Sequence, residues 1–174
     1  MLFALRDYEI RDEKGSAVVR GRGCWLIIDI EKKRPLRVQP FIEPLPPNMG
    51  IDAFPAGCPG LETQGGLSKI SERTAFYSDI DFYGHVNNAR YIQWIQDAAD
   101  MDALTGAGQI RLDINYLSEV KPGETIELWS APFAEKNFAE NSSPADYPGN
   151  AHCYAFEGRR PGAGQPVFRA ELRV

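Results

Sequence analysis

An aspartate and a histidine lie four residues apart, across a glycine, immediately before the chain's most regular helical pattern. They are Asp81 and His85 in the segment SDIDFYGHVNNARYIQW at 78–94. Free backbone N–H groups and the positive end of the helix dipole favour negative charge at a helix start. Chemistry that develops an oxyanion can use such a place, and an imidazole with an ordinary pKa of about 6.5 can relay a proton there.

Each residue of this segment has a plainer interpretation when it is taken alone. Asp81 can be an acid that the helix dipole favours, and His85 can be a loop histidine whose nitrogens are hydrogen-bonded. Asn87 and Asn88 can simply cap the first N–H groups of the helix. The chemical interpretation depends on these residues acting together.

The residues after His85 predict a helix that spans residues 86–104. The Thr105-Gly106-Ala107-Gly108 run predicts where it ends. Apolar side chains follow the spacing of one buried helical face, namely Tyr91, Trp94, Ile95, Ala98 and Met101. We expect Tyr91, Trp94 and Ile95 to be helix core rather than ligand contacts.

Strand patterns flank the helix. A strand at 69–77 leads into the Asp81 segment, and residues 135–150 read as a polar loop. Alternating or β-rich segments predict further strands at 109–120, 125–132, 151–158 and 166–174. One helix against a largely antiparallel sheet is an α+β arrangement, and a long helix wrapped by a curved sheet is the hotdog fold.

The N-terminal part has a pattern of its own. Residues 2–11 and 16–30 predict a β-hairpin closed by a glycine-containing turn. Residues 41–68 are rich in glycine and proline, which predicts a linker and a domain boundary. We therefore expect a hairpin region at 1–40, a linker at 41–68 and the helix-containing domain at 69–174.

The composition predicts a soluble, cytoplasmic protein. The 174 residues carry 19 basic and 24 acidic side chains, so the net charge of −5 gives no reason to expect nucleic acid as a partner. The N-terminus has no long apolar run, which predicts neither a signal peptide nor a membrane span. Cys24, Cys58 and Cys153 form no CxxC pair and suit reduced thiols. Two histidines without clustered partners predict no metal site, and no cofactor is expected.

The 78–94 segment resembles the helix opening of the second hotdog domain of acyl-ACP thioesterases. The family pattern there is Asp-x-Asn-x-His-Val-Asn-Asn, and the matching residues are Asp81, His85, Val86, Asn87 and Asn88. A later Tyr-x-x-Glu of the family matches Tyr116 and Glu119, the glutamate lying 34 residues after His85.

The hairpin resembles the end of that family's first hotdog domain, through the runs WLIID at 25–29 and KRPLR at 33–37. The family's first domain begins well before the equivalent of Met1. We therefore expect either a truncated reading frame or a shortened protein that assembles differently. A second departure is Tyr83, which stands where the family has asparagine and would either donate through its hydroxyl or obstruct the site.

The resemblance implies hydrolysis of acyl-ACP thioesters to free fatty acid and acyl carrier protein, in fatty acid biosynthesis. It implies that Glu119 activates water and that Asp81 is a nucleophile or orients the reacting groups. His85 would bind the carboxylates or relay a proton, and N–H groups around Val86 and Asn87 would form the oxyanion site. The residues expected to bind substrate are Tyr83, Val86, Asn87 and Asn88.

The acyl carrier protein is then the expected partner. Its acidic surface could be attracted by a group of basic residues, Lys32, Lys33, Arg34 and Arg37, together with Arg159 and Arg160. Two alternatives stay open. One is an acyl-CoA thioesterase of the single-hotdog kind, working as a homodimer. The other is a catalytically inactive hotdog protein that binds acyl chains.

Overall fold

The chain divides into two compact units, residues 1–59 and residues 60–174. The division falls within the segment rich in glycine and proline. The computed structural model describes residues 2–29, 31–32, 34–42, 50, 52–54, 57–58, 60–133, 152–162 and 164–174. The polar loop predicted at 135–150 lies outside the described residues.

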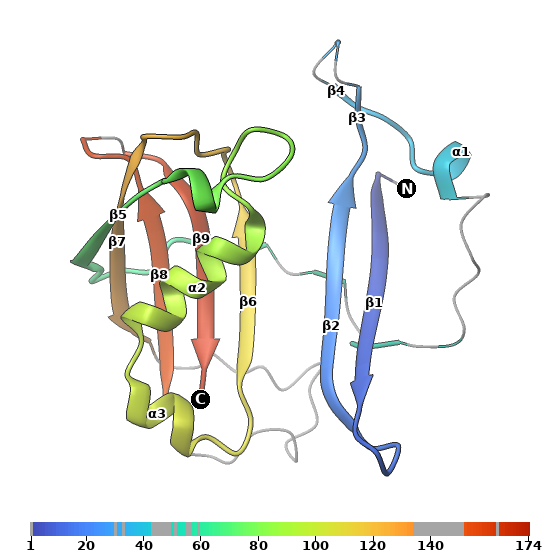
Figure 1. Ribbon diagram of the computed structural model, residues 1–174, viewed down its shortest axis with the longest axis horizontal. Coiled ribbons are helices and arrows are strands. Elements are labelled where there is room, and N and C mark those ends of the chain that lie inside the picture. The colour runs from blue at the N-terminus through green and yellow to red at the C-terminus, as the bar shows by residue number, and fades with distance from the viewer. Residues whose placement is uncertain are drawn as a thin grey trace. The chain divides into compact units, whose positions relative to one another are not determined.

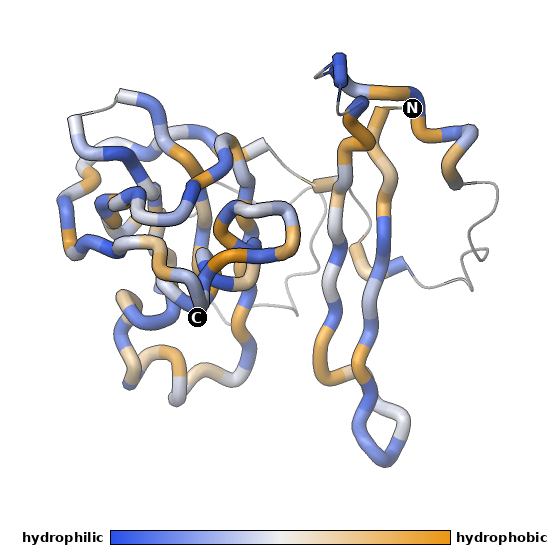
Figure 2. The backbone as a smooth tube through the Cα atoms, turned by 45° about the horizontal axis from the view of Figure 1, so that its top comes forward, coloured by the Kyte–Doolittle hydropathy of each residue, from blue (hydrophilic) through white to orange (hydrophobic). Residues whose placement is uncertain are grey.

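The first unit is built on the β-hairpin that the sequence predicts. Strands β1 (Phe3–Arg11) and β2 (Ala17–Leu26) pair antiparallel. In the turn between them, the Asp12 carboxylate accepts hydrogen bonds from the backbone N–H groups of Lys14 and Ser16, at 2.9 and 2.8 Å. Figure 2 shows this hydrophilic turn between the hydrophobic ends of the two strands. The unit continues with β3 (Ile28–Asp29), β4 (Arg34–Pro35) and α1 (Gln39–Ile42).

The expectation of reduced thiols is wrong for two of the three cysteines. Cys24 and Cys58 form a disulfide across 34 residues. The segment that precedes Cys58 is held against β2 because the Arg22 guanidinium donates to the Phe54 carbonyl at 2.7 Å and pairs with Asp52. This long-range contact has no local sequence signature. Cys153 is buried in the second unit.

The second unit is a five-stranded antiparallel sheet with the order β5-β7-β8-β9-β6. Its strands are β5 (Ser68–Thr74), β6 (Arg111–Tyr116), β7 (Thr125–Pro132), β8 (Cys153–Arg159) and β9 (Pro166–Arg173). Helix α2 (Asn88–Ala98) lies across one face of the sheet (Figure 1). The core between helix and sheet includes Tyr91, Trp94, Ile95, Ile126, Leu128, Phe156, Phe168 and Leu172. This confirms the predicted α+β arrangement.

The predicted helix at 86–104 is two helices in the structure. Helix α2 ends at Ala98, and α3 (Met101–Gly106) begins after Asp100. The Asp100 carboxylate accepts hydrogen bonds from the N–H groups of Asp102 and Ala103, so it caps a new helix inside the apolar period. Met101 therefore leaves the buried face and is 64% exposed. No helix in the described part of the chain is long and apolar enough to cross a membrane.

Candidate active site

A tight turn holds the segment from Asp81 to His85. The Gly84 N–H donates to the Asp81 carbonyl at 3.1 Å, and the Asp81 N–H donates to the His85 carbonyl at 2.9 Å. Gly84 has a φ of 80°, in the left-handed region that glycine enters without a steric penalty. The turn reverses the chain, which is how the sequence brings the acid and the imidazole side by side.

The Asp81 carboxylate lies on the Nδ1 side of the His85 ring. Its Oδ2 atom is 3.5 Å from Nδ1 of His85, and its Oδ1 atom accepts a hydrogen bond from the Tyr83 N–H at 2.8 Å. The distance of 3.5 Å is longer than a normal hydrogen bond. The negative charge still favours a proton on Nδ1, which leaves Nε2 as the nitrogen available to a substrate.

The backbone N–H groups of Val86 and Asn87, just before the helix, already donate to backbone carbonyls. The Val86 N–H donates to the Val120 carbonyl and the Asn87 N–H donates to the Asp79 carbonyl, both at 2.8 Å. Of the N–H groups expected around Val86 and Asn87 for an oxyanion site, these two already have backbone acceptors. Asn87 also caps α2, because its side chain accepts from the Ala89 N–H at 2.9 Å.

Asn88 is the donor that remains at this helix start. As the first residue of α2, its N–H has no acceptor within the helix. Neither this N–H nor the side-chain amide donates to any residue that the structure describes. Asn88 also borders a cavity beside the start of α2.

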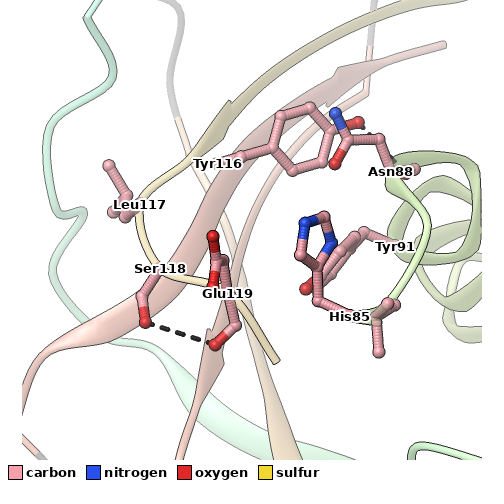
Figure 3. Close-up of a pocket in the computed structure, with 8 residues that line it drawn as sticks. His85, Asn88, Tyr91, Tyr116, Leu117, Ser118 and Glu119 are labelled. Atoms are coloured by element: carbon pink, nitrogen blue, oxygen red, sulfur yellow. Dashed lines mark hydrogen bonds between the residues drawn. The ribbon is translucent and has the colours of Figure 1, made fainter. Parts of the chain in front are cut away.

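A cavity of about 190 Å³ opens beside the start of α2. The helix side contributes His85, Val86, Asn88 and Tyr91. The end of β6 contributes Tyr116, and the segment that follows it contributes Leu117, Ser118 and Glu119. In Figure 3 the His85 ring and the Glu119 side chain border the same space. His85 comes from the turn before α2, and Glu119 comes from the segment after β6. The structure therefore brings together two residues that are 34 positions apart in the sequence.

Three of the predicted site residues lie outside this lining, namely Asp81, Tyr83 and Asn87. Asp81 lies beside His85, which lines the cavity, but does not line the cavity itself. This arrangement favours an orienting role for Asp81 over a nucleophilic one. Tyr83 is 78% exposed, and its ring is nearly parallel to that of His85 with centroids 6.1 Å apart. Leu117 and Ser118 were not predicted, since their sequence carries no signal beyond lying between Tyr116 and Glu119.

Two tyrosines form a wall of the cavity. Tyr91 is 3% exposed and packs edge-on against Tyr116 and Phe168, with ring centroids 5.6 and 5.3 Å away. The Tyr116 hydroxyl donates to the Asn88 carbonyl at 3.1 Å. Burial raises the pKa of each tyrosine to about 12, so both are neutral hydrogen-bond donors at physiological pH. The prediction for Tyr91 was incomplete, because this side chain belongs to the core and also borders the cavity.

Comparison with models of known protein families identifies the family of the chain. The model of the acyl-ACP thioesterase C-terminal domain matches residues 64–147, and the model of the N-terminal domain matches residues 1–44. The chain belongs to the acyl-ACP thioesterase family. The resemblance that the Asp81 segment and the hairpin predict is thereby confirmed. No curated protein sequence matches the chain significantly.

Solved structures of acyl-ACP thioesterases share its fold. One from Bacteroides thetaiotaomicron is 22% identical, with a TM-score of 0.62, and the match covers 99% of this chain and 63% of that chain. The 12:0-ACP thioesterase from Umbellularia californica is 18% identical, with a TM-score of 0.70 and coverage of 97% and 59%. These likenesses confirm the hotdog fold. The chain spans less than two thirds of the length of either relative.

Proposed function

We propose that this protein hydrolyses acyl-ACP thioesters to a free fatty acid and acyl carrier protein, in cytoplasmic fatty acid biosynthesis. The observation that carries the proposal is the shared cavity of His85 and Glu119 at the start of α2. Membership of the acyl-ACP thioesterase family supports the choice of substrate. The carrier protein is the partner that this function requires.

Glu119 is the general base of the proposed reaction. Its carboxylate takes a proton from water while the water oxygen bonds to the thioester carbonyl carbon. The carbonyl oxygen becomes an oxyanion, for which the Asn88 backbone N–H and side-chain amide are available donors at the helix start. One such donor is typically worth about 2.7–4 kcal/mol in the transition state.

His85 carries the proton to the leaving group. Glu119 first passes the proton that it took from water to Nε2 of His85, so the ring then carries a proton on each nitrogen. Collapse of the oxyanion breaks the carbon–sulfur bond, and the expelled thiolate takes the proton from Nε2, which returns His85 and Glu119 to their starting states. Asp81 orients the ring and favours a proton on Nδ1, opposite the reacting nitrogen.

The test is steady-state hydrolysis of acyl-ACP and acyl-CoA substrates that carry the same acyl chain. We expect a higher kcat/KM for acyl-ACP. A higher value for acyl-CoA would favour the single-hotdog acyl-CoA thioesterase, working as a homodimer. No hydrolysis of either substrate would contradict the proposed function and favour an acyl-binding protein.

A further inference from the structure

Arg160 lies in the turn between β8 and β9 and reaches the segment that carries Glu119. Its guanidinium donates to the Ser118 hydroxyl at 3.1 Å and to the Glu119 backbone carbonyl. The same group donates to both carboxylate oxygens of Glu124, each at 3.3 Å. One planar side chain therefore joins the two ends of the segment 118–124.

The Glu119 carboxylate is placed by its backbone. It has no hydrogen-bond or ion-pair partner among the described residues. On one side of it, the N–H groups of Leu117 and Ser118 donate to the Val167 carbonyl, at 2.9 and 3.1 Å. On the other side, the Val120 carbonyl accepts from Val86. Between these two anchors, Arg160 binds the carbonyl of the residue that bears the proposed base.

Glu124 holds Arg160 in this position. The Lys121 N–H donates to Oε2 of Glu124 at 2.7 Å, which fixes the carboxylate within its own turn. Hydrogen bonds from Arg160, and then from the Lys121 backbone, lower the pKa of Glu124, so this carboxylate is ionised at neutral pH. Arg160 and Glu124 thus offset each other's charge, which argues against the predicted role of Arg160 in attracting a carrier protein.

We propose that Arg160 is a positioning residue for the hydrolysis, which holds the Glu119 carboxylate at the cavity. This inference rests on the proposed role of Glu119 as the base. Arginine suits the task because its rigid fork reaches several acceptors at once, whereas lysine offers a single ammonium group. Misplacing a catalytic group by about 1 Å can lower the rate about 10²-fold.

The test compares Arg160→Ala with Arg159→Ala. Arg159 is the adjacent residue and has the same charge, but it binds Glu157 and lies over the Trp129 ring. We expect Arg160→Ala to lower kcat on acyl-ACP about 10- to 100-fold with little change in KM. Arg160→Lys should restore only part of the loss, and Arg159→Ala should keep kcat within about two-fold of wild type.

Two further measurements separate positioning from folding. If Arg160 acts through Glu119, the double variant Arg160→Ala/Glu119→Gln should be as slow as Glu119→Gln alone. Circular dichroism checks that each variant is folded. If Arg160→Ala does not fold, Arg160→Lys takes its place in the same comparisons. An unchanged kcat in the folded Arg160 variant, or an equal loss in Arg159→Ala, would overturn the positioning role. A wild-type protein that hydrolyses nothing would instead overturn the proposed function, and the positioning role with it.

Discussion

His85 and Glu119 are held at the cavity in different ways. His85 sits in a hydrogen-bonded turn with Asp81 behind its ring. The Glu119 carboxylate has no partner in the part of the chain that the structure describes, and its backbone is anchored at several points. An imidazole held in a turn suits a proton relay, and a carboxylate placed by its backbone suits a base that accepts a proton from water.

The motif singles out candidate residues for the chemistry, but it does not predict what those residues contact. Asp81, His85 and Glu119 could be singled out because type and spacing are visible in the sequence. The use of the Val86 N–H could not be predicted, because its acceptor is the Val120 carbonyl, 34 residues away. Arg160 was missed as a positioning residue for the same reason, since its contact with Ser118 spans 42 residues.

The buried side chain of Tyr91, beside the cavity, makes the stability of the fold decrease at alkaline pH. Tyr91 has its pKa raised to about 12 by burial, whereas an unfolded tyrosine ionises near the ordinary value of 10.0. The neutral phenol therefore stabilises the fold fully below about pH 10, and this contribution is lost as the pH rises toward 12. The shift corresponds to about 2–3 kcal/mol.

Denaturant unfolding of wild type and Tyr91→Phe across this range is the measurement. Stability should fall less steeply with pH in Tyr91→Phe than in wild type. Tyr77→Phe is the matched control, because Tyr77 is 94% exposed. Parallel pH profiles for wild type and Tyr91→Phe would contradict the expectation.

At the scale of elements, the contact between β8 and β9 supports Tyr91, which borders the cavity. Gly158 of β8 lies opposite Phe168 of β9, and a Cβ atom at position 158 would overlap the phenyl ring. Phe168 in turn packs against Tyr91 of α2. A glycine in one strand therefore makes room for the ring that supports the helix.

Gly158→Ala tests this arrangement. We expect it to lower the free energy of unfolding by about 1–3 kcal/mol, because the ring must move in a packed core. Gly108→Ala is the control, since a Cβ atom there has no neighbour within 4 Å. Equal stabilities of the two variants, measured by chemical denaturation, would show that the core accommodates the added methyl group.

The sequence predicts the existence of elements more reliably than their ends. The strands of the sheet follow from alternation and turn residues, and all of them are present. The break between α2 and α3 could not be read from periodicity, because Asp100 occupies a polar position that suits either a helix surface or a cap. Its bonds to Asp102 and Ala103 decide between the two.

At the scale of the whole molecule, the site and the core are concentrated in one unit. The cavity and the hydrophobic core that supports it lie within residues 60–174. Residues 1–59 contribute the hairpin and the Cys24–Cys58 disulfide, and the latter depends on a long-range contact that no local pattern predicts. The family match to both parts of the chain is what links them to one proposed activity.

The central claim is that His85 and Glu119 act together on one thioester. The most direct test is kcat on acyl-ACP for His85→Gln, Glu119→Gln and the double variant. Each single variant should lose about 10²-fold or more, and the double variant should be about as slow as the slower single one, because residues that act as a unit are not additive. Wild-type kcat in either single variant, or losses that multiply in the double variant, would contradict the account.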